Sequence, residues 1–447
     1  MQNLLIVGAS YLFYAWWDYR FLALILLSTV IDFLVANQLK KEERKRQRKW
    51  LLFISLFFNL GMLAFFKYFN FFIESWTDAW QVFGVNMNVS TLKIILPVGI
   101  SFYTFQTLSY TIDVYKKKIE PTSNIIQFAA FVSFFPQLVA GPIERASHLL
   151  PQFNTKRIFN SKFAISGFYL IIWGLFKKVV VADNCAFFVN QIFDGSAGYS
   201  SIELCLGALL FGFQIYGDFS GYSDIAIGVA RLFGFSLMTN FSFPYFSRDI
   251  AEFWRRWHIS LSTWFRDYVY IPLGGSKGTK WQSIHNVFIV FLVSGFWHGA
   301  NWTFIVWGGL HAALFLPLML LKSNRNHLKS TKVYLHQVPS LLITLVLVTI
   351  AWIFFRADNL AHAYQYIVDM CNFSHSGARV FYKSSKMLLF SSIIGFSILI
   401  LLLFEFIAVQ KNKKEVELST FTAIFIVILI CFMGVFKNPS EFIYFQF

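Results

Sequence analysis

Charged residues are scarce in this chain. Asp, Glu, Lys and Arg make up 14% of its 447 residues and 57% are hydrophobic, whereas a soluble domain carries about 25% charged residues. Charge-free runs recur along the whole length, and several approach the roughly 20 apolar residues that a helix needs to cross a bilayer. We therefore predict an all-α polytopic membrane protein with roughly 10–12 spans and some broken or re-entrant helices.

Cysteine is rare as well, and the familiar catalytic loops are missing. The four cysteines, Cys185, Cys205, Cys371 and Cys431, show no CxxC or zinc-ligand spacing, so we predict no metal site and expect them to pack in helices. No GxSxG, Walker A, GxGxxG or HExxH sequence occurs. Hydrolase, ATPase and metalloprotease interpretations therefore lack their usual parts.

No polar segment is long enough to form a soluble domain. The longest hydrophilic gaps are about 144–162 and 370–386. We therefore expect a single membrane domain over 1–447 that ends in an aromatic tail at 438–447. The N-terminal apolar run has no basic region before it and no small-residue cleavage site after it, which favours a retained span over a signal peptide.

The net charge of +15 lies largely in short loops. The run Lys40–Lys49 holds seven basic and two acidic residues. Beside a span, such a run indicates the cytoplasmic side and contacts anionic lipid headgroups. A nucleic-acid partner is disfavoured by the apolar flanks. The N-terminus then lies outside if residues 1–37 cross once, and inside if they form two short crossings.

His298 stands out because its surroundings carry no charge. It lies in the sequence GFWHGANW, inside the stretch Trp281–Leu321, which contains no Asp, Glu, Lys or Arg. This stretch is long enough for two spans. An ionisable residue within a membrane is a functional candidate by default. A histidine that merely bonds a neighbouring helix is the alternative, and this stretch alone leaves both open.

A second unusual histidine, His258, lies in a segment rich in Trp and Arg. Residues 240–281 are too polar to span a membrane. Ser247 or Asp249 could cap a helix that runs to about Tyr270. Histidine is the side chain best matched to acid–base catalysis near neutral pH, but His258 and His298 can meet only through tertiary folding.

On that predicted helix, Arg255, Ser262 and Arg266 fall on one face, with His258 beside them. One interpretation is an amphipathic helix on the membrane surface. The other is a cationic rim over a cavity, ready for a phosphate-bearing donor. Three tryptophans of the segment suit an interfacial belt: Trp254, Trp257 and Trp264.

Two further segments are unexpectedly polar. Residues 135–144 place two prolines and a glycine at membrane depth, and such a break normally lines a cavity. Asp218–Asp224 places two carboxylates and two serines between apolar runs. We interpret it as a cap and turn, with support of a functional site as the alternative.

These motifs together resemble the membrane-bound O-acyltransferase family. The resemblance rests on Glu252–Gly275 and Ser294–Trp302, and segments 135–145, 218–228 and Tyr11–Arg20 extend it over essentially the whole chain. It is closest to the branch that contains the alginate O-acetylation membrane protein and the peptidoglycan O-acetyltransferase membrane subunit.

The resemblance implies a ring of helices around a funnel, with a catalytic histidine at His298 and a second one at His258. It also implies a cytoplasmic acyl thioester donor, such as acetyl-CoA. We expect His298 to deprotonate the incoming hydroxyl and His258 to orient or polarise the thioester. From charge and position, Arg255, Arg256 and Arg266 are candidates to hold donor phosphates. Further supporting candidates are Trp297, Asn301 and Ser262.

In this branch the acyl group passes outward to an extracytoplasmic partner of the SGNH-hydrolase type, which acylates the polysaccharide. The resemblance therefore implies that this chain contacts the polymer only indirectly. The aromatic tail contains Tyr444, whose phenol has a pKa of about 10 and could serve as an acyl relay. Packing of the tail in the interfacial belt is the alternative.

We therefore predict a bacterial inner-membrane O-acetyltransferase subunit for an envelope polysaccharide such as alginate or peptidoglycan. Three alternatives stay open. One is a related acyltransferase that uses another carrier, such as the D-alanyl transferase of teichoic acids. Another is a lipid acyltransferase, and the last is a polysaccharide transporter without catalysis.

Overall fold

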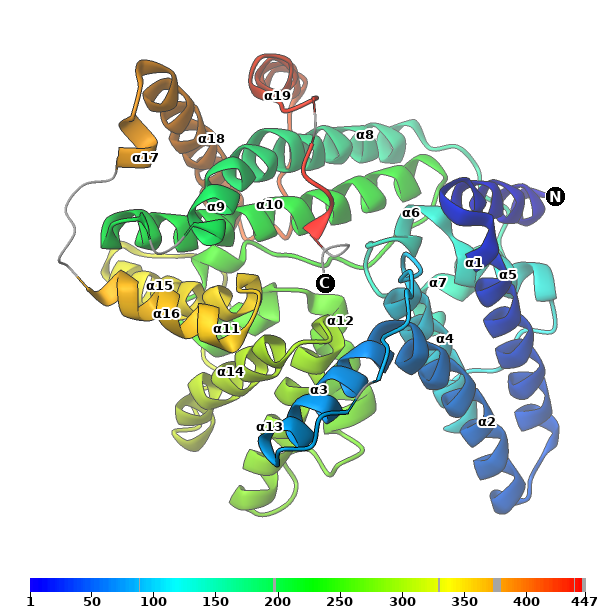
Figure 1. The fold of residues 1–447 in the computed structure, drawn as a ribbon. Coiled ribbons are helices and arrows are strands. Elements are labelled where there is room, and N and C mark those ends of the chain that lie inside the picture. The colour runs from blue at the N-terminus through cyan, green and yellow to red at the C-terminus, as the bar shows by residue number, and fades with distance from the viewer. Residues whose placement is uncertain (88, 196–197, 329, 373–378, 438, 444–447) are drawn as a thin grey trace. The chain divides into compact units, whose positions relative to one another are not determined.

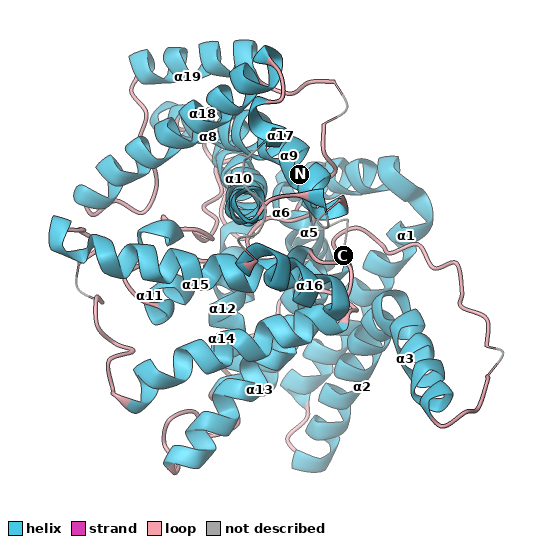
Figure 2. Ribbon diagram, turned by 60° about the vertical axis from the view of Figure 1, so that its left-hand side comes forward, coloured by secondary structure: helices cyan, strands magenta, loops and turns pink. Residues whose placement is uncertain are grey.

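The computed structural model describes residues 1–447 except 88, 196–197, 329, 373–378, 438 and 444–447 (Figure 1). The predicted relay residue Tyr444 lies outside the described residues. Helices and loops make up the described part of the chain, without a strand (Figure 2). The predicted all-α class is confirmed.

Seven helices among the described residues are long and apolar enough to cross a membrane. This count is below the roughly 10–12 spans expected, because several other helices are shorter or more polar than a span. The helices of span length are Gln2–Lys41, Lys45–Val82, Ser161–Asp194, Ser201–Leu232, Trp302–Leu320, Leu335–Arg356 and Ser385–Gln410.

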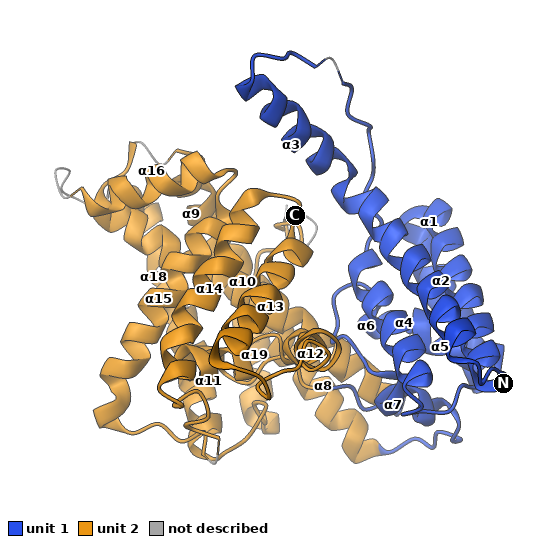
Figure 3. Ribbon diagram, turned by 90° about the horizontal axis from the view of Figure 1, so that it is seen from below, with its two compact units in different colours: residues 1–160, 233–238 blue, residues 161–232, 239–447 orange. Residues whose placement is uncertain are grey.

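The chain divides into two compact units (Figure 3). Unit 1 comprises Met1–Asn160 and Phe233–Met238, and unit 2 comprises Ser161–Leu232 and Thr239–Phe447. Neither unit is one continuous stretch of chain, because residues 233–238 return to unit 1.

Unit 1 is built from helices packed around the first one. Its elements are α1 (Gln2–Lys41), α2 (Lys45–Leu63), η1 (Ala64–Tyr68), α3 (Phe69–Val82), α4 (Ile100–Tyr115), α5 (Ile125–Ser133), α6 (Phe135–Leu138), α7 (Ala146–Leu149) and η2 (Leu150–Phe153). Helix α1 is interrupted at Asp18, where the backbone is extended and the carboxylate accepts a hydrogen bond from the Arg20 backbone at 2.9 Å. A helix of 40 residues spans roughly 60 Å, twice the hydrocarbon core. The interruption therefore favours two short segments over one crossing.

The predicted break near residue 140 is present. Short α6 is followed by irregular backbone up to Arg145, and Gly141 and Glu144 are buried there. Glu144 accepts hydrogen bonds from the Met238 backbone and from His148 Nδ1, the latter at 2.7 Å. The bond from Met238 fastens the end of residues 233–238 onto the irregular segment of unit 1.

Unit 2 contains every histidine and arginine proposed for the site. Its elements are α8 (Ser161–Leu175), η3 (Phe176–Ala182), α9 (Asp183–Asp194), α10 (Ser201–Leu232), η5 (Pro244–Phe246), α11 (Ile250–Arg256), α12 (Ile259–Phe265), η6 (Arg266–Tyr270), α13 (Lys280–His298), α14 (Trp302–Leu320), η7 (Leu335–Gln337), α15 (Val338–Arg356), α16 (Leu360–Cys371), α17 (Arg379–Tyr382), α18 (Ser385–Gln410) and α19 (Thr420–Met433).

Helix α10 runs without interruption through Asp218 and Asp224, so the predicted cap and turn is wrong. Ion pairs hold both carboxylates in mid-helix. Lys178 Nζ lies 2.7 Å from Asp218, and Lys177 Nζ lies 2.5 Å from Asp224. Both lysines come from the π-helix η3, which packs along α10. Carboxylates that have cationic partners need no turn at this position.

The charge-free stretch from Trp281 forms two helices, as predicted. Helix α13 ends at His298, and α14 begins at Trp302. Asn301 caps α14, because its side chain accepts a hydrogen bond from the Thr303 backbone at 3.0 Å. His298 therefore lies at the end of a helix, directly before an irregular turn.

Candidate active site

The predicted continuous helix from residue 249 to Tyr270 is wrong, because the helix breaks at His258. Helix α11 ends at Arg256 and α12 begins at Ile259. His258 lies between them in the left-handed region, at φ 43° and ψ 54°. The Ile259 backbone donates to the Asn240 carbonyl at 2.8 Å instead of continuing the helix. A tertiary contact therefore ends α11 where the local pattern predicted continuation.

The start of α11 matches one of the two predicted caps, since Asp249 accepts from the Glu252 backbone at 2.6 Å. The surface-helix interpretation is wrong. Trp257 and Trp264 are only 2% and 6% exposed, so neither belongs to an interfacial belt. This segment packs inside unit 2.

Asn240 fixes the orientation of His258. The Asn240 Oδ1 atom lies 3.0 Å from His258 Nδ1, 2.9 Å from Ser260 Oγ and 3.3 Å from the Ser260 backbone nitrogen. A backbone N–H can only donate, which identifies this Asn240 atom as the acceptor oxygen. His258 Nδ1 must therefore carry the proton, and Nε2 presents a lone pair. Asn240 is held in turn by Ser223 Oγ of α10, at 3.1 Å from its Nδ2.

His258 is fully buried. Burial lowers the pKa of His258 to about 3, because a desolvated site disfavours the imidazolium form. The ring therefore stays neutral across the physiological pH range. It can accept a hydrogen bond at Nε2 in that state.

The fold brings His258 and His298 together. Their ring centroids are 6.4 Å apart, at an interplanar angle of 60°. His298 is 3% exposed and contacts aromatic rings on several sides, including Trp297 at 5.0 Å and Trp307 at 5.0 Å. The Trp297 ring also lies 6.0 Å from His258. The two buried imidazoles thus lie among the same aromatic side chains, and such apolar surroundings keep water away from their ring nitrogens.

A cavity of about 610 Å³ lies between α12, η6, α13 and α14. Ser262 and Ser294 line it, and each is one helical turn from a histidine in sequence, after His258 and before His298 respectively. Four cationic residues also line it: Arg266, Lys280, Lys322 and Arg325. Its apolar lining includes Phe265, Val287, Val290, Phe291, Phe315, Met319 and Leu320. The cavity therefore combines positive charge with an apolar wall.

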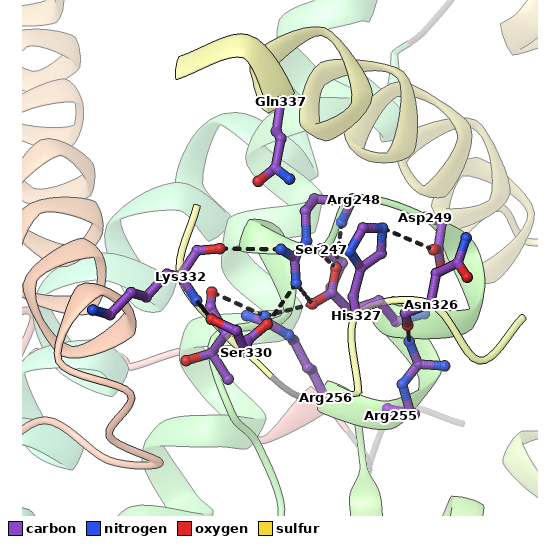
Figure 4. Close-up of polar contacts among 12 residues, drawn as sticks. Ser247, Arg248, Asp249, Arg255, Arg256, Asn326, His327, Ser330, Lys332 and Gln337 are labelled. Atoms are coloured by element: carbon purple, nitrogen blue, oxygen red, sulfur yellow. Dashed lines mark hydrogen bonds and ion pairs between the residues drawn. The ribbon is translucent and has the colours of Figure 1, made fainter. Parts of the chain in front are cut away.

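The three arginines predicted to hold donor phosphates have different positions, and Figure 4 shows two of them, Arg255 and Arg256. Arg266 lines the cavity. Arg255 donates to the backbone carbonyls of Asn324 and Asn326, each at 2.8 Å. Arg256 is 5% exposed and ion-paired with Glu252 at 2.6 Å. The structure therefore brings only Arg266 of these three to the cavity lining.

Arg248 completes a buried cluster around Glu252. Its guanidinium lies 2.7 Å from the Glu252 carboxylate and donates to the carbonyls of Ser330 and Lys332 at 2.9 and 3.0 Å (Figure 4). Burial alone would raise the pKa of Glu252, but the hydrogen bond from Arg248 and the charge of Arg256 lower it below its usual value. This cluster anchors the connection between α14 and η7 to α11.

The remaining predicted supporting residues act at different places. Trp297 contacts both histidine rings, Ser262 lines the cavity, and Asn301 caps α14 while donating to the Asp358 carbonyl at 2.7 Å. Residue patterns did not single out Asn240 or the cavity cations Lys280, Lys322 and Arg325. Their roles depend on contacts between segments far apart in sequence.

The family model described as MBOAT, membrane-bound O-acyltransferase family, matches residues 9–357. The chain belongs to the membrane-bound O-acyltransferase family. This match includes both histidines and every residue that lines the cavity. The enzyme is therefore a multi-pass membrane acyltransferase.

Its relatives include polysaccharide-modifying members of this acyltransferase family. It is 42% identical to the probable alginate O-acetylase AlgI of Pseudomonas aeruginosa over 83% of this chain and 70% of the relative. It is 33% identical to a peptidoglycan O-acetyltransferase of Helicobacter pylori over 100% of this chain and 91% of the relative. A teichoic acid D-alanyltransferase of Bacillus subtilis is 29% identical over 50% of this chain and 58% of the relative.

Proposed function

We propose that this acyltransferase is the bacterial inner-membrane subunit of a system that O-acetylates an envelope polysaccharide such as alginate or peptidoglycan. The observation that carries the proposal is the buried pair of His258 and His298, each one helical turn from a serine that lines a cavity with cationic and apolar walls. The names of the alginate and peptidoglycan relatives support acetyl as the group transferred.

The cavity suits an acyl thioester on a phosphate-bearing carrier, such as acetyl-CoA. Guanidinium and ammonium groups bind phosphate through charge-assisted hydrogen bonds, and Arg266, Lys322 and Arg325 provide them here. The apolar wall provides a dry surface for the arm that carries the acyl group. Ser262 and Ser294 mark the part of the cavity that is nearest to the histidines in sequence.

In our proposal His298 is the general base. It takes the proton of an acceptor hydroxyl, the oxygen attacks the thioester carbonyl carbon, the C–S bond breaks, and the proton returns to the departing thiolate. His258 has too low a pKa for that task, about 3. Its Nδ1–H is engaged by Asn240, so Nε2 has no proton with which to polarise the thioester carbonyl. Because the single proton of the hydroxyl goes to His298, the neutral His258 instead accepts a hydrogen bond at Nε2 from another donor group of the bound substrate.

The acceptor hydroxyl is that of Tyr444 in this scheme, and the acetyl group then passes to an extracytoplasmic partner of the SGNH-hydrolase type. The Tyr444→Phe variant keeps an aromatic ring and removes the hydroxyl. We expect it to abolish polysaccharide acetylation while the protein still folds. Acetylation at the wild-type level in this variant would remove Tyr444 from the scheme.

The transfer reaction is tested with purified protein in liposomes, supplied with radiolabelled acetyl-CoA and the extracytoplasmic partner. We expect label to move with wild-type protein and with His336→Gln, an exposed histidine outside the site. His298→Ala should lose label transfer by a factor on the order of 100 or more. Transfer from a D-alanyl carrier protein but not from acetyl-CoA would overturn the acetyl donor in favour of the D-alanyl alternative. Full activity of His298→Ala would overturn the catalytic role.

The donor cavity is tested by its cations. Lys322→Gln combined with Arg325→Gln should raise the KM for acetyl-CoA about tenfold and leave kcat nearly unchanged, because phosphate binding precedes chemistry. Lys386→Gln, an exposed lysine that does not line the cavity, serves as the matched control. An unchanged KM in the double variant would place the donor elsewhere.

A further inference from the structure

After its last helix, α19, the chain runs along the π-helix η3. We refer to residues 434–437 and 439–443 as the C-terminal strap. The Val435 backbone donates to the Val179 carbonyl at 2.9 Å, and Asn184 Nδ2 donates to the Met433 carbonyl at 2.9 Å. A π-helix shifts the usual backbone pairing, and such turns are frequent at functional sites. Here the Val179 carbonyl of η3 accepts the first bond of the strap.

A buried ion cluster holds the far end of the strap. Lys178 Nζ lies 2.9 Å from Asp183, 2.7 Å from Asp218 and 3.1 Å from the Ser440 carbonyl. The other oxygen of Asp218 accepts the Ile443 backbone N–H at 2.7 Å. Asp218 thus joins a cation on one side to the strap on the other.

The strap reaches the wall of the histidine site. Phe442 and Ile443 are 8% and 1% exposed. The Phe442 ring lies 5.1 Å from Tyr222 and 6.2 Å from Phe219. The Phe219 ring contacts His258 edge-on, at 4.6 Å. One aromatic ring therefore separates the strap from the buried imidazole.

We propose that Lys178 and Asp218 are positioning residues that hold the C-terminal strap against the Phe219–His258 wall. This inference rests on the proposed acyl transfer, because the strap leads in sequence into the tail that contains Tyr444. Buried ion pairs add little net stability, since desolvation offsets their attraction. An ion cluster that binds main-chain groups of one segment instead fixes the position of that segment. A displacement of about 1 Å at a reacting group can lower the rate on the order of 100-fold.

The chain provides a matched control in the adjacent residue. Lys177 also comes from η3 and also pairs with a carboxylate of α10, Asp224. It also lies 5.7 Å from the ring of Tyr216 and attracts the buried carboxylate of Glu405, but no described contact joins it to the strap. Lys177→Met therefore removes a buried ion pair of the same kind, while Lys178→Met removes one that also binds the strap.

The first test measures the strap directly, without an activity assay. Full-length protein in detergent is digested with carboxypeptidase Y, and the mass of the remaining chain is measured by mass spectrometry. We expect wild type and Lys177→Met to keep Phe442 and Ile443, because both side chains are buried. Lys178→Met and Ile443→Pro, which lacks the N–H that Asp218 accepts, should be trimmed past Phe442. Equal trimming of wild type and both strap variants would overturn the inference.

The second test separates positioning from folding. In the acetyl-transfer assay, we expect kcat to fall on the order of 10- to 100-fold in three variants, with an unchanged KM for acetyl-CoA. These are Lys178→Met, the double variant Lys178→Met with Asp218→Asn, and Ile443→Pro. The conservative variant Ile443→Val keeps the backbone N–H and should have the same kcat as wild type. If wild type transfers acetyl and Ile443→Pro matches it in kcat, the strap has no positioning role. If wild type transfers no acetyl but still keeps Phe442 and Ile443 during digestion, the proposed function fails and the anchor stands.

Discussion

At the scale of single residues, the backbone of His258 is the most informative feature. A residue other than glycine in the left-handed region carries strain of roughly 1–2 kcal/mol. Asn240 stabilises this left-handed backbone of His258, because its backbone and side-chain oxygens together bind Ile259, Ser260 and His258. The same contacts that break the helix also set the tautomer of the ring. The contacts of Asn240 therefore account both for the strained backbone of His258 and for the position of the proton on its ring.

Replacement of Asn240 tests the tautomer. Asn240→Ala removes the acceptor of the Nδ1 proton and should lower kcat on the order of 10- to 100-fold with the protein still folded. Asn240→Asp places a negative charge beside His258 and should raise its pKa from about 3. The imidazolium form lacks the Nε2 lone pair, so activity of this variant should fall at acidic pH and recover as the pH rises.

The measurement is the dependence of kcat on pH for wild type and both variants. Ser223→Ala serves as the control, because it loses only the bond to the amide of Asn240 and should keep the wild-type profile shape. Superimposable pH profiles for wild type and Asn240→Asp would show that the contact with residue 240 does not control the protonation of His258.

At the scale of elements, the crossing of α13 and α14 places His298. A Cβ atom on Gly295 would lie 2.2 Å from the Phe304 carbonyl, and one on Gly308 would lie 2.3 Å from the Phe291 carbonyl. Small residues let membrane helices approach closely. The two glycines therefore set how closely α13 and α14 approach, and His298 follows Gly295 by one turn.

Gly295→Ala should separate these helices, lower stability by about 1–3 kcal/mol and reduce acetyl transfer. Gly309→Ala is the matched control, because its Cβ would meet only Leu292 at an ordinary 3.8 Å. The readouts are the melting temperature of the purified protein and kcat. Equal behaviour of the two variants would contradict the close-packing argument.

The pair of Glu144 and His148 makes the irregular segment of unit 1 sensitive to pH. The hydrogen bond with Glu144 raises the pKa of His148, and burial raises the pKa of Glu144. Both groups bind protons more tightly in the folded state, so their stabilisation is greatest at low pH. For His148 it is complete below about 6.5 and is lost as the pH rises through its raised pKa.

His148→Gln removes this titration. The melting temperature of wild type should exceed that of the variant most at pH 6, and the difference should shrink towards pH 9. His336→Gln, an exposed control, should show no such trend. A gap that is constant over this pH range would mean that His148 contributes by packing alone.

At the scale of the whole molecule, the basic run gives the chain its expected orientation. Lys40–Lys49 occupies the end of α1, the short connection and the start of α2. Arg48 is buried, where it donates to the carbonyls of Leu39 and Tyr115, while most of the other basic residues of the run are exposed. Exposed Lys and Arg beside spans favour the cytoplasmic side.

A protease site inserted after Glu43 tests this orientation. Protease added to inverted membrane vesicles should cut the protein, and protease added to intact spheroplasts should leave it whole. A site inserted in the same way after Lys322, which lines the cavity proposed to bind the donor, should behave identically, since a thioester on a charged carrier cannot cross the bilayer. Cleavage of either site in spheroplasts would reverse the assigned side.

The amino-acid sequence by itself determined the membrane class, the family, the two helices before and after Gly299 and the break after Leu138. These follow from hydropathy, covalent order and local backbone chemistry. Tertiary structure alone decided the break at His258, the ion pairs of Asp218 and Asp224, and the separate positions of the three arginines. Each depends on partners far away in the chain, such as Asn240 and the lysines of η3. Local sequence patterns identify which polar residues are costly to bury. Only the packed helices show which groups form hydrogen bonds and ion pairs with them.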